Sequence, residues 1–97
     1  MDFEVTVPPG TPQGAPITFA SSANGWIHEP MTWIASDRAI GTFAVPRGQY
    51  VFYKYARGDW STVEKWPGCV EATNRYELGA AHPTKKDTVW MWADMCP

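Results

Sequence analysis

Prolines and glycines divide this chain into short segments, and that division limits the folds available to it. The 97 residues include nine prolines and eight glycines, and β-prone runs lie between them. Such punctuation is typical of a β-sandwich or barrel, and no helix-period pattern of useful length interrupts it. We therefore expect an all-β, antiparallel chain. The expected strands cover residues 2–7, 16–21, 31–35, 40–45, 49–57, 61–66, 74–78 and 87–93.

Alternation within residues 49–57 assigns their side chains to two faces. Successive residues of a strand point to opposite sides. Val51, Tyr53 and Tyr55 therefore share one face, and Lys54 lies on the other. A lysine is seldom fully buried. The face that carries Lys54 is therefore expected to be the wetter one.

The six tryptophans exceed what a small sandwich core can bury, which is about two or three. Trp33 lies within the apolar run MTWIA and is expected in the core. Trp90 and Trp92 alternate onto one face of the last expected strand, which either packs on the sheet or lies open. Three others border turns, where an exposed ring is costly unless it covers a loop or binds something. These loop-edge rings are Trp26, Trp60 and Trp66.

Charge and length exclude several functional classes. The net charge is −2 without a block of lysines or arginines, so we expect no nucleic-acid partner. No apolar run approaches the ~20 residues that span a bilayer, so we expect no membrane insertion. CxxC and paired-histidine spacings are absent, which predicts neither a metal site nor a cofactor. At this length, residues 1–97 are expected to form one domain.

The two cysteines, Cys69 and Cys96, leave two alternatives open. The first ten residues, MDFEVTVPPG, show no basic region followed by an apolar block, so no signal peptide is expected. Without a secretion signal, two reduced thiols are favoured over one disulfide. A native start at Met1 would indicate the cytoplasm, whereas loss of a leader or of a host enzyme would indicate secretion.

Catalytic groups are few. Only His28 and His82 would act as conventional bases near neutral pH. Glu64, Glu71 and Glu77 are carboxylates of the type that hydrolyse glycosides, but nothing in the sequence places them around a cleft. No nucleophile elbow or phosphate-cradling loop is present. We therefore expect a chain that is not an enzyme.

Several short motifs occur in an order that resembles a known family. NGW at 24–26, YKYARGDW at 53–60 and NR at 74–75 are similar to motifs of starch- and glycogen-binding modules, carbohydrate-binding module families 20 and 48. PPGTPQGAPITFA at 8–20 and DTVWMWAD at 87–94 resemble the opening and closing strands of these modules. The resemblance implies an antiparallel immunoglobulin-like β-sandwich of seven to eight strands.

The resemblance also implies roles for individual residues. Trp26 and Trp60 correspond to the two stacking platforms, although Trp60 lies one residue closer to the lysine than in the glycogen-binding type. Lys54 and Asn74 correspond to the groups that hydrogen-bond sugar hydroxyls. Glu64 corresponds to the acid of a WES pattern, but Val63 replaces its tryptophan. Trp66 is the candidate to supply the aromatic surface that the missing tryptophan would have provided.

The implied function is non-catalytic binding of α-1,4-glucans such as starch, glycogen, maltooligosaccharides and cyclodextrin. The module would target an attached or associated enzyme to this polymer. The alternative is a regulatory module that kept the fold, lost the sugar site and docks another protein through Trp90 and Trp92. These two functions are distinguished by whether maltooligosaccharide changes the tryptophan fluorescence.

Overall fold

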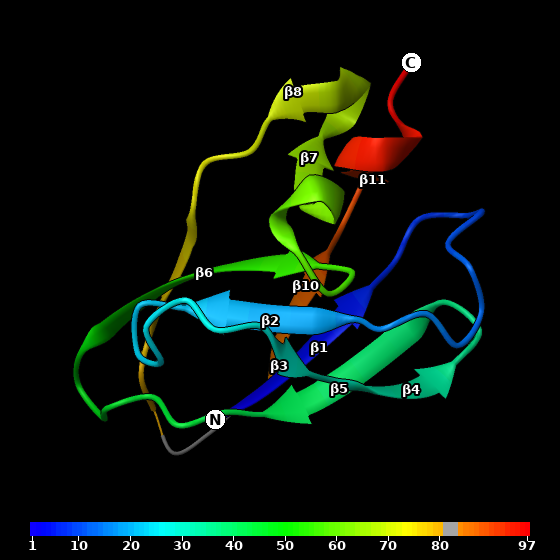
Figure 1. Ribbon diagram of the computed structural model, residues 1–97. Helices are drawn as coiled ribbons and strands as arrows, with labels where there is room; N and C mark the ends of the chain where they lie inside the picture. The colour runs from blue at the N-terminus through cyan, green and yellow to red at the C-terminus, as the bar shows by residue number, and fades with distance from the viewer. Residues whose placement is uncertain (81–83) are drawn as a thin grey trace.

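The computed structural model describes residues 1–80 and 84–97 and contains eleven strands in three sheets (Figure 1). Sheet A has the order β10-β1-β5-β4, sheet B the order β3-β2-β6-β9 and sheet C the order β11-β7-β8. Sheet A consists of β1 (Asp2–Thr6), β4 (Thr32–Ala35), β5 (Arg38–Thr42) and β10 (Lys85–Thr88). Sheet B consists of β2 (Thr18–Ser21), β3 (Glu29–Pro30), β6 (Tyr50–Ala56) and β9 (Arg75–Leu78). Sheet C consists of β7 (Glu64–Trp66), β8 (Val70–Glu71) and β11 (Met91–Trp92).

The structure confirms the all-β sandwich. Three short 3₁₀ helices, η1 (Trp60–Thr62), η2 (Pro67–Cys69) and η3 (Ala93–Met95), are the helical elements of the described residues. All strand pairs are antiparallel except β1 with β10, which run parallel. No hairpin connects these two strands, so no turn forces them to run in opposite directions. Among the described residues, no helix has the length and apolar character to cross a bilayer.

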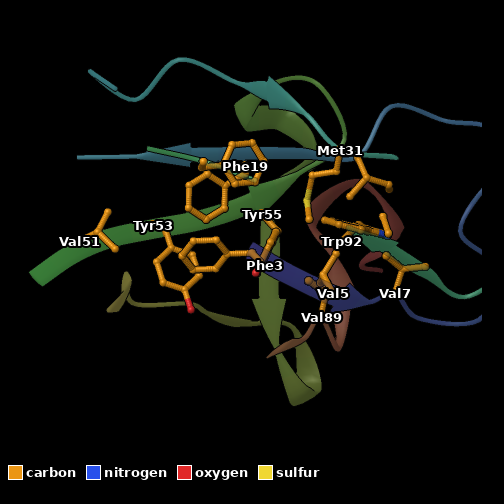
Figure 2. Packing of buried hydrophobic residues seen from close by; sticks show 13 residues of the cluster. Phe3, Val5, Val7, Phe19, Met31, Val51, Tyr53, Tyr55, Val89 and Trp92 are labelled. Carbon is orange, nitrogen blue, oxygen red and sulfur yellow. The ribbon is translucent and has the colours of Figure 1, made fainter. Parts of the chain in front are cut away.

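The core lies between sheets A and B (Figure 2). Phe3 on β1 packs against Phe19 on β2 with 4.5 Å between ring centroids, and Phe19 stacks on Phe43 at 4.2 Å. Tyr53 and Tyr55 on β6 enter the same cluster and are fully buried. The predicted alternation of β6 is thus confirmed, and Lys54 points away from this core.

The C-terminal tryptophans do not share a face. Trp90 is 54% exposed, whereas Trp92 is 0% exposed and donates its indole N–H to Thr11 Oγ1 at 2.9 Å. The prediction of strict alternation through residues 87–93 is wrong because β10 ends at Thr88 and a separate strand, β11, begins at Met91. Trp33 is partly buried against the core, and its indole N–H bonds Ala15 O at 2.9 Å.

Cys69 and Cys96 form a disulfide, which corrects the expectation of two reduced thiols. The β7–β8 hairpin and η3 stand together at one end of the sandwich (Figure 1). This arrangement brings the two Cα atoms to 6.0 Å, within the usual range for a disulfide. The bond therefore fastens the C-terminal segment onto sheet C.

We predict that replacing both cysteines with serine lowers the free energy of unfolding by about 2–4 kcal/mol, because the bond closes a loop across 27 residues of the unfolded chain. Urea denaturation of the parent and of the Cys69→Ser/Cys96→Ser variant measures this difference. The reduced parent is the control and should behave as the double variant does. An unchanged unfolding midpoint after verified reduction would contradict the prediction.

Candidate functional site

Trp26 is presented by a tight loop built around Asn24. The Asn24 side chain accepts a bond from Ser21 N at 3.1 Å and donates one to Ile27 O at 2.9 Å. Trp26 N donates to Ser21 O at 2.8 Å, and the Trp26 backbone has φ = +63°. That conformation is costly for a residue with a bulky side chain, and such strain is concentrated at functional sites. The loop therefore holds the indole in place at a cost in local stability.

Trp60 begins η1, directly after the turn that follows β6. The Asp59 carboxylate caps this short helix by accepting a bond from Ser61 N at 2.9 Å. Thr62 Oγ1 accepts a bond from Arg57 N at 3.0 Å and donates to Asp59 O at 2.9 Å. These bonds fix the turn while the Trp60 ring remains exposed.

The two indoles form an angled pair. The Trp26 and Trp60 ring centroids are 6.2 Å apart, and their planes are inclined by 52°. His28 touches the Trp60 ring edge-on at 4.5 Å, and its Nδ1 lies 3.1 Å from Thr18 Oγ1. His28 thus packs against the Trp60 ring and links it to β2 through Thr18, a role that the sequence did not indicate.

Lys54 and Asn74 lie next to the last pair of the β6–β9 ladder, Tyr53–Arg75. Lys54 is half-buried on the outer side of β6 and pairs with Ala20 on β2. Asn74 directly precedes β9 and is exposed. An ammonium and a side-chain amide together offer donors and an acceptor to a polar ligand.

Glu64 lies in the interior of the protein. Its side chain accepts a bond from Tyr55 N at 2.9 Å and a bidentate pair from Arg75, with Nη2 2.7 Å from Oε1 and Nε 3.0 Å from Oε2. Both carboxylate oxygens are therefore engaged within the fold. Because Glu64 is buried and both of its oxygens are bonded, it holds Arg75 in place and does not reach the protein surface.

Trp66 is likewise tied to Arg75. The guanidinium carbon lies 5.0 Å from the centre of the Trp66 ring, within the range of a cation–π contact. Trp66 is partly buried and pairs with Val70 across the β7–β8 hairpin. It therefore covers the Glu64–Arg75 pair, and it does not contact the Trp26–Trp60 pair through any aromatic interaction among the described residues.

Arg75 also reaches a third element, β10. Its Nη2 donates to Thr88 O at 2.6 Å, and its Nη1 lies 3.5 Å from Asp87 Oδ1. The hydroxyls of Tyr53 and Tyr55 donate to Asp87 Oδ2 at 2.6 and 2.9 Å. The sequence analysis did not predict this polar cluster. Two features of the sequence pointed to it: the two tyrosines that alternate onto the inner face of β6, and the arginine of the NR motif.

Environment shifts the pKa values of this buried cluster. Burial, together with the neighbouring Asp87 carboxylate, raises the pKa of Tyr53 and of Tyr55 well above the ordinary value of 10.0. Burial lowers the pKa of Arg75, but the hydrogen bond and charge of Glu64 outweigh it and the net shift is upward. The tyrosines therefore remain neutral and the arginine charged in the folded state.

The remaining acids do not form a catalytic pair. Glu71 is bound to Lys65 in sheet C, and Glu77 lies 3.2 Å from Lys85 at the edge of sheets A and B. Over residues 1–80 and 84–97, no group of three or more histidines, cysteines or acids is placed to hold a metal ion. His82 lies outside the described residues.

Comparison with known proteins identifies two long relatives. The chain is 34% identical over 98 residues to an alpha-amylase of Niallia circulans, covering 95% of this chain and 8% of the relative. It is 35% identical over 100 residues to an amylopullulanase of Thermoanaerobacterium thermosulfurigenes, covering 96% of this chain and 5% of that relative. No family model matches the chain. The similarity thus concerns a small part of two much longer proteins.

We predict that stability falls above about pH 10. Unfolded tyrosines ionise near that pH while Tyr53 and Tyr55 stay protonated in the fold, so the folded state binds more protons. Each buried tyrosine then lowers the free energy of unfolding by about 1.4 kcal/mol per pH unit. Urea denaturation between pH 8 and pH 11, from about two units below the reference pKa to about one unit above it, measures the slope.

Tyr53→Phe removes one of the two hydroxyls and should reduce this slope by about half. Tyr50→Phe is the matched control, because it removes a tyrosine hydroxyl from the exposed outer face of the same strand. An identical slope for parent and Tyr53→Phe would show that the buried tyrosines do not govern alkaline stability.

Proposed function

We propose that this chain is a non-catalytic module that binds α-1,4-glucans for an attached or associated enzyme. The observation that carries the proposal is the angled pair of Trp26 and Trp60, whose ring centroids are 6.2 Å apart and of which Trp60 is exposed. The two relatives are named as enzymes that act on α-glucans, and this chain corresponds to 8% and 5% of them. A small all-β unit of this kind fits an accessory domain of such an enzyme.

Two indoles inclined by 52° suit a curved sugar chain. The C–H face of a pyranose stacks on an aromatic ring, and consecutive units of an α-1,4-glucan turn with respect to each other. A flat β-1,4-glucan such as cellulose would require nearly coplanar rings. Trp26 and Trp60 would thus hold two successive glucose units of amylose.

Lys54 and Asn74 would bind the sugar hydroxyls. An ammonium donates only, whereas an amide both donates and accepts, so together they satisfy adjacent hydroxyls of one glucose. Trp66 would flank this position through its contact with Arg75. Glu64 would act through Arg75, because its own oxygens are occupied within the fold.

The expected affinity is weak. Each stacked ring contributes about 1 kcal/mol, and each sugar hydrogen bond contributes ~1 kcal/mol net. After the cost of association, the dissociation constant falls between ~10 µM and ~1 mM. Such affinity is useful on a polymer, where many equivalent sites keep a linked enzyme near its substrate.

Protein docking through the last strand has less support. That function required Trp90 and Trp92 to be exposed together, but Trp92 fills the core. The remaining exposed ring, Trp90, provides a single aromatic contact on that surface. We therefore place glucan binding first.

Isothermal titration with β-cyclodextrin tests the proposal. The parent should bind in the micromolar to millimolar range and should not bind cellohexaose. Trp60→Ala should weaken binding by about tenfold or more, since it removes a stacking platform together with the surface that the second ring completes. Trp90→Ala is the matched control and should bind as the parent does. If Trp60→Ala binds β-cyclodextrin as tightly as the parent, the platform assignment is wrong.

A further inference from the structure

We infer that a second group of aromatic rings on the same face of sheet B binds additional units of a long α-glucan. This inference rests on the proposed function and extends the site along the sheet. The group, here called the outer aromatic strip, consists of Tyr50 and Phe52 on β6 and Tyr76 on β9.

The strip is a continuous set of open rings. Phe52 pairs directly with Tyr76 in the β6–β9 ladder, and their ring centroids lie 6.4 Å apart. Tyr50 meets Tyr76 edge-on at 6.2 Å. All three side chains are between 45% and 66% exposed. Three large rings left open on one small sheet face are unusual for a surface that binds nothing.

The strip is also continuous with Lys54. Tyr50, Phe52 and Lys54 are alternate residues of β6, so they point to the same side at intervals of about 7 Å. On the neighbouring strand, Tyr76 lies two residues after Asn74, which directly precedes β9. A sugar chain bound between the angled indoles and Lys54 therefore has a direct path over Phe52 and Tyr76.

The chemistry of the strip favours a sugar over an apolar partner. Two of its three rings are tyrosines, which combine a flat apolar face with a hydroxyl that hydrogen-bonds. The strand that bears it also carries an ammonium on the same side at Lys54. Ring faces together with these polar groups fit the C–H faces and hydroxyls of a glucan.

Chain length separates this strip from the first site. Maltotriose fills the angled indoles without reaching far along β6, whereas maltoheptaose covers both regions. We therefore expect the parent to bind maltoheptaose more tightly than maltotriose. The double variant Phe52→Thr/Tyr76→Thr should weaken maltoheptaose binding about five- to thirtyfold, the effect of losing one or two aromatic contacts of about 1 kcal/mol each. Its affinity for maltotriose should stay unchanged.

Ile34→Thr is the matched control, because Ile34 is an exposed apolar strand residue on sheet A, and it should not alter either affinity. Threonine suits a strand, and thermal unfolding of each variant verifies the fold. An equal loss for both sugars, or none for maltoheptaose, would overturn the extension while leaving the first site intact. A parent that binds neither sugar would instead refute the proposed function. A change in sedimentation of the double variant would assign the strip to contacts between copies and also overturn the inference.

Discussion

The arrangement of the three sheets depends on one partly buried arginine, Arg75. Arg75 on β9 of sheet B bonds Glu64 on β7 of sheet C and approaches Asp87 on β10 of sheet A. A buried ion pair contributes little by itself, but removing one partner typically costs about 3–5 kcal/mol because a charge is left unpaired. The three sheets are thus constrained to meet at this point.

The contacts of Arg75 with Glu64 and Asp87 also help to determine which side chains of β6 face outward. Asp87 accepts bonds from Tyr53 and Tyr55, which fixes the inner face of β6. Alternation then directs Lys54 and Phe52 to the opposite face, beside the loop that holds Trp26. Glu64 binds Tyr55 N as well, so β7 and the η1 turn before it, with Trp60, are anchored to the same strand. The candidate site therefore lies on the outer face of sheet B. On the inner face of this sheet, the charged side chains of Arg75, Glu64 and Asp87 contact one another.

The sequence predicted the features that depend on local pattern. The all-β fold and the two faces of β6 follow from turn residues and alternation, and the structure confirms both. Trp26 and Trp60 border turns and lie beside each other, Trp60 exposed and Trp26 partly buried. Other features depend on contacts between distant residues and leave no local pattern. The break between β10 and β11, the burial of Trp92, the Cys69–Cys96 bond and the inward place of Glu64 belong to this group.

The central claim is that the angled indole pair is where α-glucan binds, and the six indole N–H resonances in a ¹H–¹⁵N spectrum test it most directly. Assignment by single Trp→Phe variants, followed by titration with maltotriose, reports each ring separately. We expect progressive shifts for Trp26 and Trp60, while the resonances of the buried Trp92 and the exposed Trp90 stay fixed. Shifts confined to Trp90, or no shift at sugar concentrations well above the expected dissociation constant, would contradict it.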